Sequence, residues 1–144
     1  MSRTLLGLAL LAVLALLGCA DATAGPGSGA AGPPPGPRPA TAEDLLGRWY
    51  PADGTAHGRA FAEFAADGGW TGSDGCNGQR GTWTLRSDNG AFTGTAGPST
   101  LIACENVPIA RWIAEAGRVG IDGGDLVLSD ADGTEQARLV RELP

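Results

Sequence analysis

The sequence predicts a mainly β (α+β) domain with about eight short antiparallel strands in a curled, partly closed barrel and one amphipathic helix packed against it. Two observations lead to this fold class. Short apolar runs alternate with turn signals about every 8–12 residues over most of the region 41–144, which is typical of antiparallel β-domains. A single segment near 109–116 has the apolar period of a helix instead. Because a small open sheet leaves edges exposed, we expect the strands to curl toward closure.

The strand segments alternate apolar and polar residues between turns that contain Gly and Asp. In the run 59–65, Ala60, Ala62 and Phe64 fall on one face of the chain. Asp88-Asn89-Gly90 is a typical hairpin turn. The eight predicted strands cover residues 45–50, 59–65, 70–75, 79–86, 91–95, 119–121, 126–128 and 137–140.

The helix is predicted where the apolar period changes. Apolar residues recur there at i, i+3, i+4 and i+7, which is the stripe of an amphipathic helix. These residues are Ile109, Trp112, Ile113 and Ala116. Asn106 is a candidate N-cap, Pro108 falls in the first turn, and Gly117 can end the helix. We expect the helix to cover one face or one open end of the sheet.

The N-terminus has the pattern of an export signal. Arg3 precedes an almost wholly apolar run over 5–17, and a small residue and a cysteine follow it. The order Leu16-Leu17-Gly18-Cys19 resembles the lipobox of bacterial lipoproteins. This resemblance implies that residues 1–18 are a signal peptide that is removed, and that Cys19 carries fatty acyl chains such as palmitate. An ordinary secretory signal is the alternative, whereas about 13 apolar residues are too few for a transmembrane helix, which needs ~20.

Residues 19–40 are predicted to be the lipidated cysteine and a disordered tether. The segment is rich in Pro and Gly and has no core-forming residue after Cys19, so burial cannot offset the entropy lost on ordering. A flexible coil of this length spans on the order of 25 Å. We therefore expect the folded domain, residues 41–144, to be held off the extracytoplasmic face of a cell membrane.

The predicted domain is acidic, with 15 Asp and Glu residues against 8 arginines, and the chain contains no lysine. A basic patch is the usual footprint of nucleic-acid binding, so nucleic acid is not an expected partner. The acidic charge also opposes docking on anionic lipid. We expect the N-terminal lipid to provide membrane attachment, and the protein to be a monomer.

Two cysteines remain if Cys19 is acylated. An even number of cysteines in an oxidising compartment favours a disulfide between Cys76 and Cys104. Closing this loop of about 28 residues would stabilise the domain by roughly 3.5 kcal/mol on the chain-entropy model. Two free thiols or a catalytic cysteine are the alternatives.

Several motifs occur in an order that is known from one protein family. They are Leu46-Gly47-x-Trp49, Gly72-Ser73-Asp74-Gly75-Cys76-Asn77, Gly81-x-Trp83 and Ser99-Thr100-Leu101-Ile102-Ala103-Cys104. Over about 43–142, their order and spacing resemble the META domain, the family that includes the HslJ-type heat-shock lipoproteins. Ile102 stands where the family commonly has methionine. The resemblance implies a non-enzymatic protein linked to stress response, drug tolerance or secretion, with a fold similar to the cracked barrel of secretion pilot lipoproteins.

The motif residues Gly75, Asn77 and Thr100 are expected to serve the structure. Glycine permits positive φ, and an asparagine side chain bonds nearby backbone groups. We interpret the motif as a tight, disulfide-pinned turn in which Asn77 satisfies buried amides, and we expect Thr100 to do the same before Cys104. A ligand contact is the alternative.

No catalytic set, cofactor site or metal site is predicted. His57, the only histidine, lies between turn residues, and Ser73 lacks the Gly-x-Ser-x-Gly context of a nucleophile elbow. The acidic run 130–135 lacks the glutamate at the twelfth position of a calcium loop, and a β-turn is expected there.

We therefore expect a membrane-tethered, non-enzymatic binding or envelope-stress module that accepts an envelope protein or an apolar ligand. The ligand would enter the barrel or a groove beside the helix. The aromatic candidates for either place, or for core packing, are Trp49, Trp70, Trp83 and Trp112. The alternatives are a thiol or other hydrolase that uses Cys76 or Cys104, and a structural accessory of a secretion or envelope assembly.

Overall fold

The computed structural model describes residues 35–100, 102–104 and 106–143. The predicted signal peptide, Cys19 and most of the predicted tether lie outside the described residues. Within these ranges, no helix is long and apolar enough to cross a membrane.

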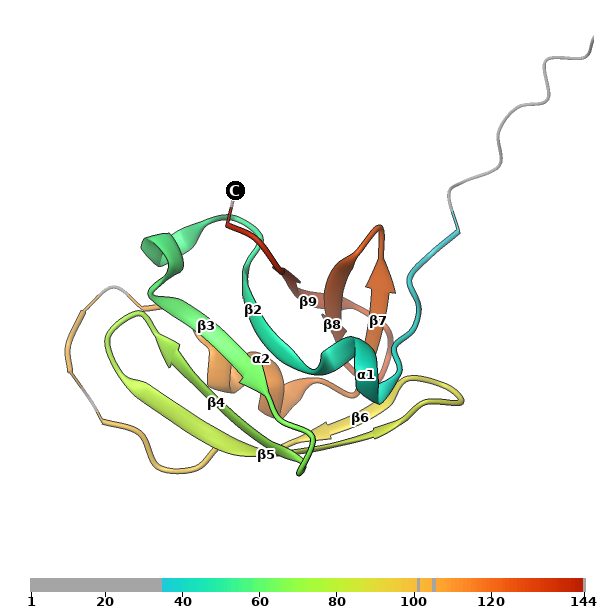
Figure 1. The fold of residues 1–144 in the computed structure, drawn as a ribbon, viewed down its shortest axis with the longest axis horizontal. Helices are drawn as coiled ribbons and strands as arrows, with labels where there is room; N and C mark the ends of the chain where they lie inside the picture. Colours follow the sequence, from blue (N-terminus) through green and yellow to red (C-terminus); the bar gives the residue numbers. More distant parts are fainter. Residues whose placement is uncertain (1–34, 101, 105, 144) are drawn as a thin grey trace, which may run out of the picture. The chain divides into compact units, whose positions relative to one another are not determined.

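Eight antiparallel strands form a closed barrel in which each strand pairs with the next one along the chain (Figure 1). The last strand returns to pair with the first, so the predicted mainly β fold is confirmed and its closure is complete. Each predicted strand overlaps one of the eight. They are β2 (Gly47–Pro51), β3 (Ala60–Phe64), β4 (Gly69–Asp74), β5 (Gly78–Arg86), β6 (Ala91–Gly94), β7 (Arg118–Asp122), β8 (Asp125–Ser129) and β9 (Glu135–Val140).

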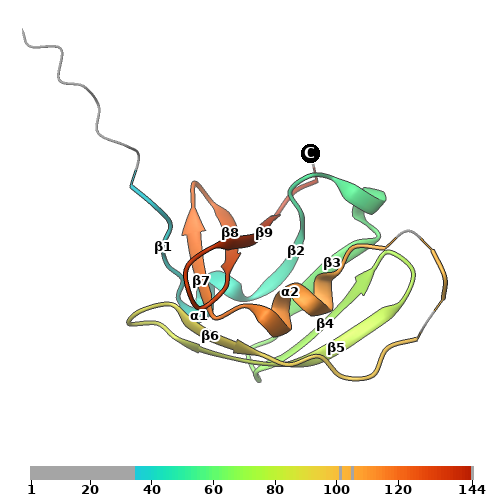
Figure 2. The same ribbon diagram turned by 180° about the vertical axis from the view of Figure 1, so that it is seen from behind.

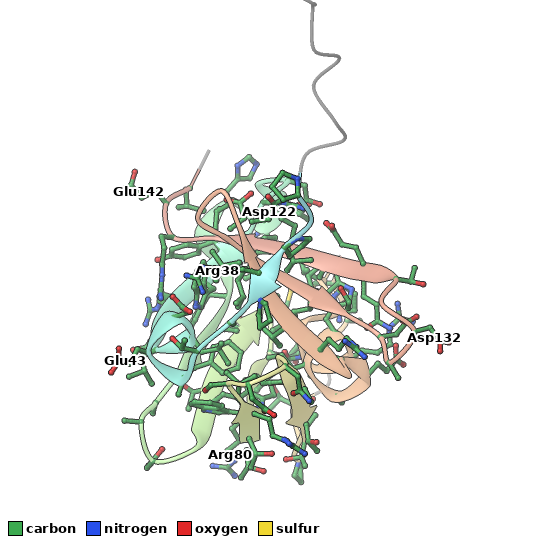
Figure 3. The ribbon with its side chains drawn as sticks, turned by 90° about the vertical axis from the view of Figure 1, so that its right-hand side faces the viewer. Arg38, Glu43, Arg80, Asp122, Asp132 and Glu142 are labelled. Atoms are coloured by element: carbon green, nitrogen blue, oxygen red, sulfur yellow. A yellow bond between two sulfur atoms is a disulfide. The ribbon has the colours of Figure 1, made fainter. Side chains whose placement is uncertain are left out.

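The barrel has few paired positions between β6 and β7. The register of these strands has one paired position, Ala91 opposite Arg118. Further along, β7 pairs with a short additional strand, β1 (Arg38–Pro39), in which Arg38 lies opposite Ile121. Figure 3 shows this strand and labels Arg38. The strand β1 therefore pairs with the part of β7, Gly120 and Ile121, that follows the position paired with β6.

The folded domain thus begins before residue 41, and the prediction of a tether up to Ala40 is wrong for its last residues. Ala40 is fully buried, and its N–H donates to the carbonyl oxygen of Val119 at 3.1 Å. The guanidinium of Arg38 makes two hydrogen bonds to the Asp44 carboxylate, at 2.8 and 2.9 Å. Proline-rich composition predicted disorder, but proline is compatible with an edge strand, which need not donate at every position.

A single helical turn, α1 (Ala42–Leu45), stands where a strand was predicted to begin at residue 45. Thr41 and Asp44 form a capping box, because each side chain accepts a hydrogen bond from the backbone N–H of the other. The Arg38 side chain and the Thr41 N–H hold the pKa of the Asp44 carboxyl well below its ordinary value. The turn places Leu45 in the core, where it is fully buried.

The helix α2 (Ile109–Glu115) contacts β3, β4 and β6 (Figure 2). Its buried residues are Ile109 and Ile113, in agreement with the predicted apolar stripe. Asn106 is not the N-cap, since Pro108 holds that position without a side-chain hydrogen bond. A helix of two turns with no cap depends on tertiary packing for its stability, and burial of the two isoleucines provides that packing.

Side chains fill the inside of the barrel. The largest fully buried ones include Trp49, Trp70 and Phe64, and Phe64 makes edge-to-face contacts with Trp83 and Phe92. This packing favours the surface of the domain over the barrel interior as the place for a ligand.

The glycine of the Gly81-x-Trp83 motif is required by a close approach. The indole Nε1–H of Trp70 donates to the carbonyl oxygen of Thr95 at 2.7 Å. A Cβ atom on residue 81 would overlap both of these groups. Glycine at position 81 of β5 therefore leaves room for the hydrogen bond between Trp70 of β4 and Thr95, the residue after β6.

Candidate functional site

Asn77 is the centre of a buried polar network and has 2% of its surface exposed. Its Nδ2 donates to Asp74 Oδ2 at 3.0 Å and to the carbonyl oxygen of Ile102 at 3.3 Å. Its Oδ1 accepts hydrogen bonds from Thr100 Oγ1 at 3.0 Å and from the Ile102 N–H at 2.7 Å. The side chain thus makes all four hydrogen bonds that an amide can make, which supports the structural interpretation of Asn77 and Thr100.

Asp74 is the second member of the network and has 3% of its surface exposed. Its Oδ1 accepts the backbone N–H groups of Cys76 and Asn77 at 2.8 and 2.6 Å, and its Oδ2 also accepts Asn106 Nδ2 at 3.2 Å. Burial is the largest influence and would raise the pKa of Asp74, but the hydrogen bonds from Asn77, Cys76 and Asn106 outweigh it and the pKa is lowered. The carboxylate is therefore a charged acceptor inside the protein.

Sequence reasoning assigned no role to Asp74, and it expected Asn106 to cap the helix and not to bind Asp74. The signal for Asp74 was present, because Asp followed by Gly-Cys-Asn is an Asx-turn pattern in which the carboxylate bonds backbone groups two and three residues on. No comparable local signal existed for Asn106, whose partner lies 32 positions away in the sequence.

A disulfide joins Cys76 in the β4–β5 turn to Cys104, with Cα atoms 6.6 Å apart. Gly75 precedes it with φ of +104°, a conformation that L side chains rarely adopt, and a Cβ there would approach the Ala56 Cβ to 3.1 Å. The described residues between 95 and 107 (95–100, 102–104, 106 and 107) are hereafter called the braced loop. The disulfide at Cys104 and the Asp74–Asn77 network both hold this loop against the β4–β5 turn.

Among its described residues, the braced loop displays one large apolar side chain to solvent. Ile102 is 61% exposed, although its backbone N–H and carbonyl oxygen are both bound to Asn77. A hollow of about 570 Å³ lies beside the loop and is lined by Thr71, Gly78, Gln79, Arg80, Pro98, Ser99 and Thr100. A second hollow of about 360 Å³ includes Gln79, Thr100 and Ile102 itself. Asn77 and Thr100 of the motifs therefore hold the loop in place, and Ile102 with its neighbours forms the accessible surface.

The other residues considered for chemistry have structural or exposed positions. His57 is exposed in the short 3-10 turn η1 (Thr55–Gly58), and Ser73 Oγ accepts the N–H of Gly75 at 3.0 Å. The carboxylate Oδ1 of Asp130 accepts the N–H groups of Asp132 and Thr134 at 3.0 and 2.9 Å, so this run is a turn. Across the described ranges, no group of three or more His, Cys, Asp or Glu side chains is arranged to hold a metal ion.

The four tryptophans divide into two kinds. Trp49, Trp70 and Trp83 are buried, and each donates its indole N–H to a backbone carbonyl oxygen. Trp112 on α2 is only half-buried and lines a hollow of about 320 Å³. Only Trp112 therefore remains a candidate for the groove beside the helix.

These features define a small closed antiparallel barrel with one packed helix and a disulfide-braced loop. The chain belongs to the META domain family, whose family model matches residues 45–142. Among solved structures, it is similar to a DUF4847 family protein from Bacteroides vulgatus ATCC 8482, with 15% identity and a TM-score of 0.56 over 69% of this chain and 95% of that one. At this identity, the likeness concerns the fold alone. No curated protein matches the chain.

Proposed function

We propose that this protein is a membrane-anchored, extracytoplasmic lipoprotein whose META domain is a non-enzymatic binding module. Cys19 holds the lipid, the Pro- and Gly-rich segment spaces the domain from the membrane, and Ile102 on the braced loop docks a protein of the cell envelope. The accessory role in envelope stress or drug tolerance that the family resemblance implies is part of this proposal.

The observation that carries the docking function is the way Ile102 is held. An exposed apolar side chain gains free energy when a partner buries it, and a rigid backbone loses little entropy on binding. Asn77 binds both backbone groups of Ile102, and the disulfide closes the loop two residues later. The hollow beside the loop, with Arg80 in its wall, offers room for the neighbouring residues of a partner.

The thiol-hydrolase alternative has less support. A cysteine nucleophile must be a thiolate, whereas Cys76 and Cys104 are joined to each other. Thiol titration of the purified protein separates the two functions, because the hydrolase requires a rapidly alkylated cysteine in the active form.

Anchoring is tested by labelling cells with an alkyne analogue of palmitate. We expect label and membrane fractionation for the wild type, and neither for Cys19→Ala, because the acylated thiol is then absent. Mass spectrometry of the wild type should find an acylated cysteine as the first residue. An uncleaved, unmodified N-terminus in the membrane fraction contradicts the anchor.

Docking is tested by photocrosslinking in intact cells from a probe amino acid placed at Ser99. We expect one or a few discrete adducts in the wild type, and their yield should fall at least about tenfold in Ile102→Ser, since burial of an isoleucine contributes roughly 1.5–3 kcal/mol. Leu143→Ser is the matched control, because Leu143 is the other large apolar side chain that is strongly exposed in the described residues, at 47%. Equal adduct yields in the two variants would refute docking through Ile102.

A further inference from the structure

The strand β5 begins with a stretch whose outer edge is unpaired in the part of the chain that the structure describes. In the β4–β5 hairpin, the Asp74 N–H donates to the carbonyl oxygen of Asn77 at 3.2 Å. Bonded and non-bonded pairs alternate along an antiparallel ladder. The backbone N–H and carbonyl groups of Gly78 and Arg80 therefore point away from β4.

The chain after β6 covers this outer edge only in part. The Gly97 N–H donates to the carbonyl oxygen of Arg80 at 2.8 Å. The next bonded position in this register would place Ser99 opposite Gly78, but no hydrogen bond joins these two residues. In both views of the ribbon, the chain after β6 bows away from the β4–β5 hairpin (Figures 1 and 2). The pairing of β5 on this side thus ends before the strand does.

Three backbone groups remain without a partner among the described residues. They are the N–H of Arg80 and both the N–H and the carbonyl oxygen of Gly78, and the two residues are exposed. A Cβ on residue 78 would meet no atom within 4 Å. The hollow of about 570 Å³ beside the braced loop has both residues in its wall. Because an unpaired strand edge is a template for another strand, this edge has the groups and the room to accept one.

Arg80 gives this hollow a positive charge. It is the one charged residue among the described residues that line the hollow. Within the described ranges, no carboxylate lies at ion-pair distance from its guanidinium. Figure 3 shows Arg80 apart from the acidic residues that are labelled there. An arginine without a partner in a chain of net charge −6 favours a carboxylate of a binding partner.

We propose that β5 binds an extended, acidic segment of the docked protein as an additional antiparallel strand. One residue of this segment exchanges two hydrogen bonds with Gly78, the Arg80 N–H donates to a second carbonyl oxygen, and the Arg80 guanidinium meets an Asp or Glu side chain. The inference rests on the proposed docking function, because the hollow that includes Ile102 also shares Gln79 and Thr100 with this one. A segment added to β5 can thus reach Ile102.

The test is an NMR titration of the acylated protein in nonionic detergent with the peptide acetyl-Val-Glu-Val-Glu-Val-amide. We expect a Kd on the order of millimolar. The amide protons of Gly78 and Arg80 should move downfield and exchange more slowly, because each gains a hydrogen bond. The peptide with lysine in place of both glutamates should bind at least about threefold more weakly, since Arg80 repels it.

Methylation of the peptide nitrogens tests the strand geometry without altering the protein. Side chains of paired residues lie on one face of a sheet, so the glutamates that meet Arg80 occupy the positions whose N–H groups point to β5. Methylation of both glutamate nitrogens should therefore weaken binding at least about tenfold. Methylation of two valine nitrogens is the matched control and should leave the Kd unchanged, because these N–H groups point to the other edge of the segment.

Arg80→Gln should weaken binding of the acidic peptide about threefold. Arg118→Gln is the matched control, because Arg118 is also exposed on a strand and has no ion pair within the described ranges. The proposal is overturned if the acidic and basic peptides bind equally, if the glutamate N-methyl groups are tolerated, or if the two variants weaken binding equally. Slow exchange of the Gly78 and Arg80 amides that increases with protein concentration before peptide is added would assign the edge to a second copy and also overturn it.

Photocrosslinking from Ser99 in cells separates this inference from the docking function. We expect the adduct yield to fall about threefold in Arg80→Gln. Adducts that are lost in Ile102→Ser but unchanged in Arg80→Gln would retain docking and overturn strand addition. Peptide binding at Gly78 and Arg80 without any adduct in cells would support the strand edge as a peptide site and refute docking of an envelope protein.

Discussion

Asn77→Ala is expected to lower the free energy of unfolding by about 3 kcal/mol at neutral pH. The substitution removes four hydrogen bonds from a side chain that is almost fully buried, and it leaves the Ile102 N–H without its acceptor. Alanine cannot replace any of these bonds. Urea denaturation followed by tryptophan fluorescence measures the loss.

Asn89→Ala is the control for this substitution. Asn89 is exposed in the β5–β6 turn and its Oδ1 accepts one backbone N–H, that of Ala91 at 3.0 Å. We expect a loss of about 0.5 kcal/mol there, typical of an exposed turn. Similar losses in the two variants would show that the buried network does not stabilise the loop.

The unfolding free energy of Asn77→Ala should also depend on pH differently from that of the wild type. Because hydrogen bonds lower the pKa of Asp74 below its ordinary value of 3.8, its ionised form stabilises the folded state above that value, and this contribution is lost as the pH falls through the lowered pKa. Asn77→Ala removes one of the donors that lower the pKa of Asp74, the side-chain Nδ2, whereas the backbone N–H of residue 77 is retained. The difference in unfolding free energy between wild type and variant should therefore narrow from pH 7 to about pH 3, and a constant difference would contradict this role of Asp74.

Removal of the disulfide by the paired substitution Cys76→Ser and Cys104→Ser should lower the unfolding free energy by roughly 3.5 kcal/mol. The bond closes a loop with a sequence separation of 28, so its loss frees the unfolded chain. Reductant should lower the urea midpoint of the wild type to about that of the paired variant, and it should leave the midpoint of the paired variant unchanged. A loss below about 1 kcal/mol would mean that the loop is held by the Asn77 network alone.

The disulfide and Asn77 hold the same loop, so their effects should not add. Once one of the two is lost, the braced loop is free to move, and the other then contributes less. Combining the cysteine pair with Asn77→Ala should therefore cost less than the sum of the separate losses. Strict additivity would show that the two braces act on independent parts of the loop.

Much of the fold was predictable because its patterns are local. Alternation at Ala60, Ala62 and Phe64 predicted a buried face of β3, and the period of 3.6 predicted that Ile109 and Ile113 of α2 are buried. Both follow from the direction of successive Cβ atoms along the backbone. The strand β1 was missed because its prolines suit either a free tether or a sheet edge, and only the neighbouring strand decides between them.

Local patterns of the sequence were enough to predict the succession of the eight barrel strands, the helix α2, the acidic charge and the motifs that place the chain in its family. The sequence also predicts acylation of Cys19 and removal of residues 1–18, which stay predictions. Folding of the whole chain was needed to bring Asp74, Asn77 and Asn106 into one network, to expose Ile102 beside it, and to place the half-buried Trp112 in the wall of a hollow. The physical reason is sequence separation: Ile102 and Asn106 meet the Asp74–Asn77 turn across 25 or more positions of chain, and such contacts exist only after the barrel has closed.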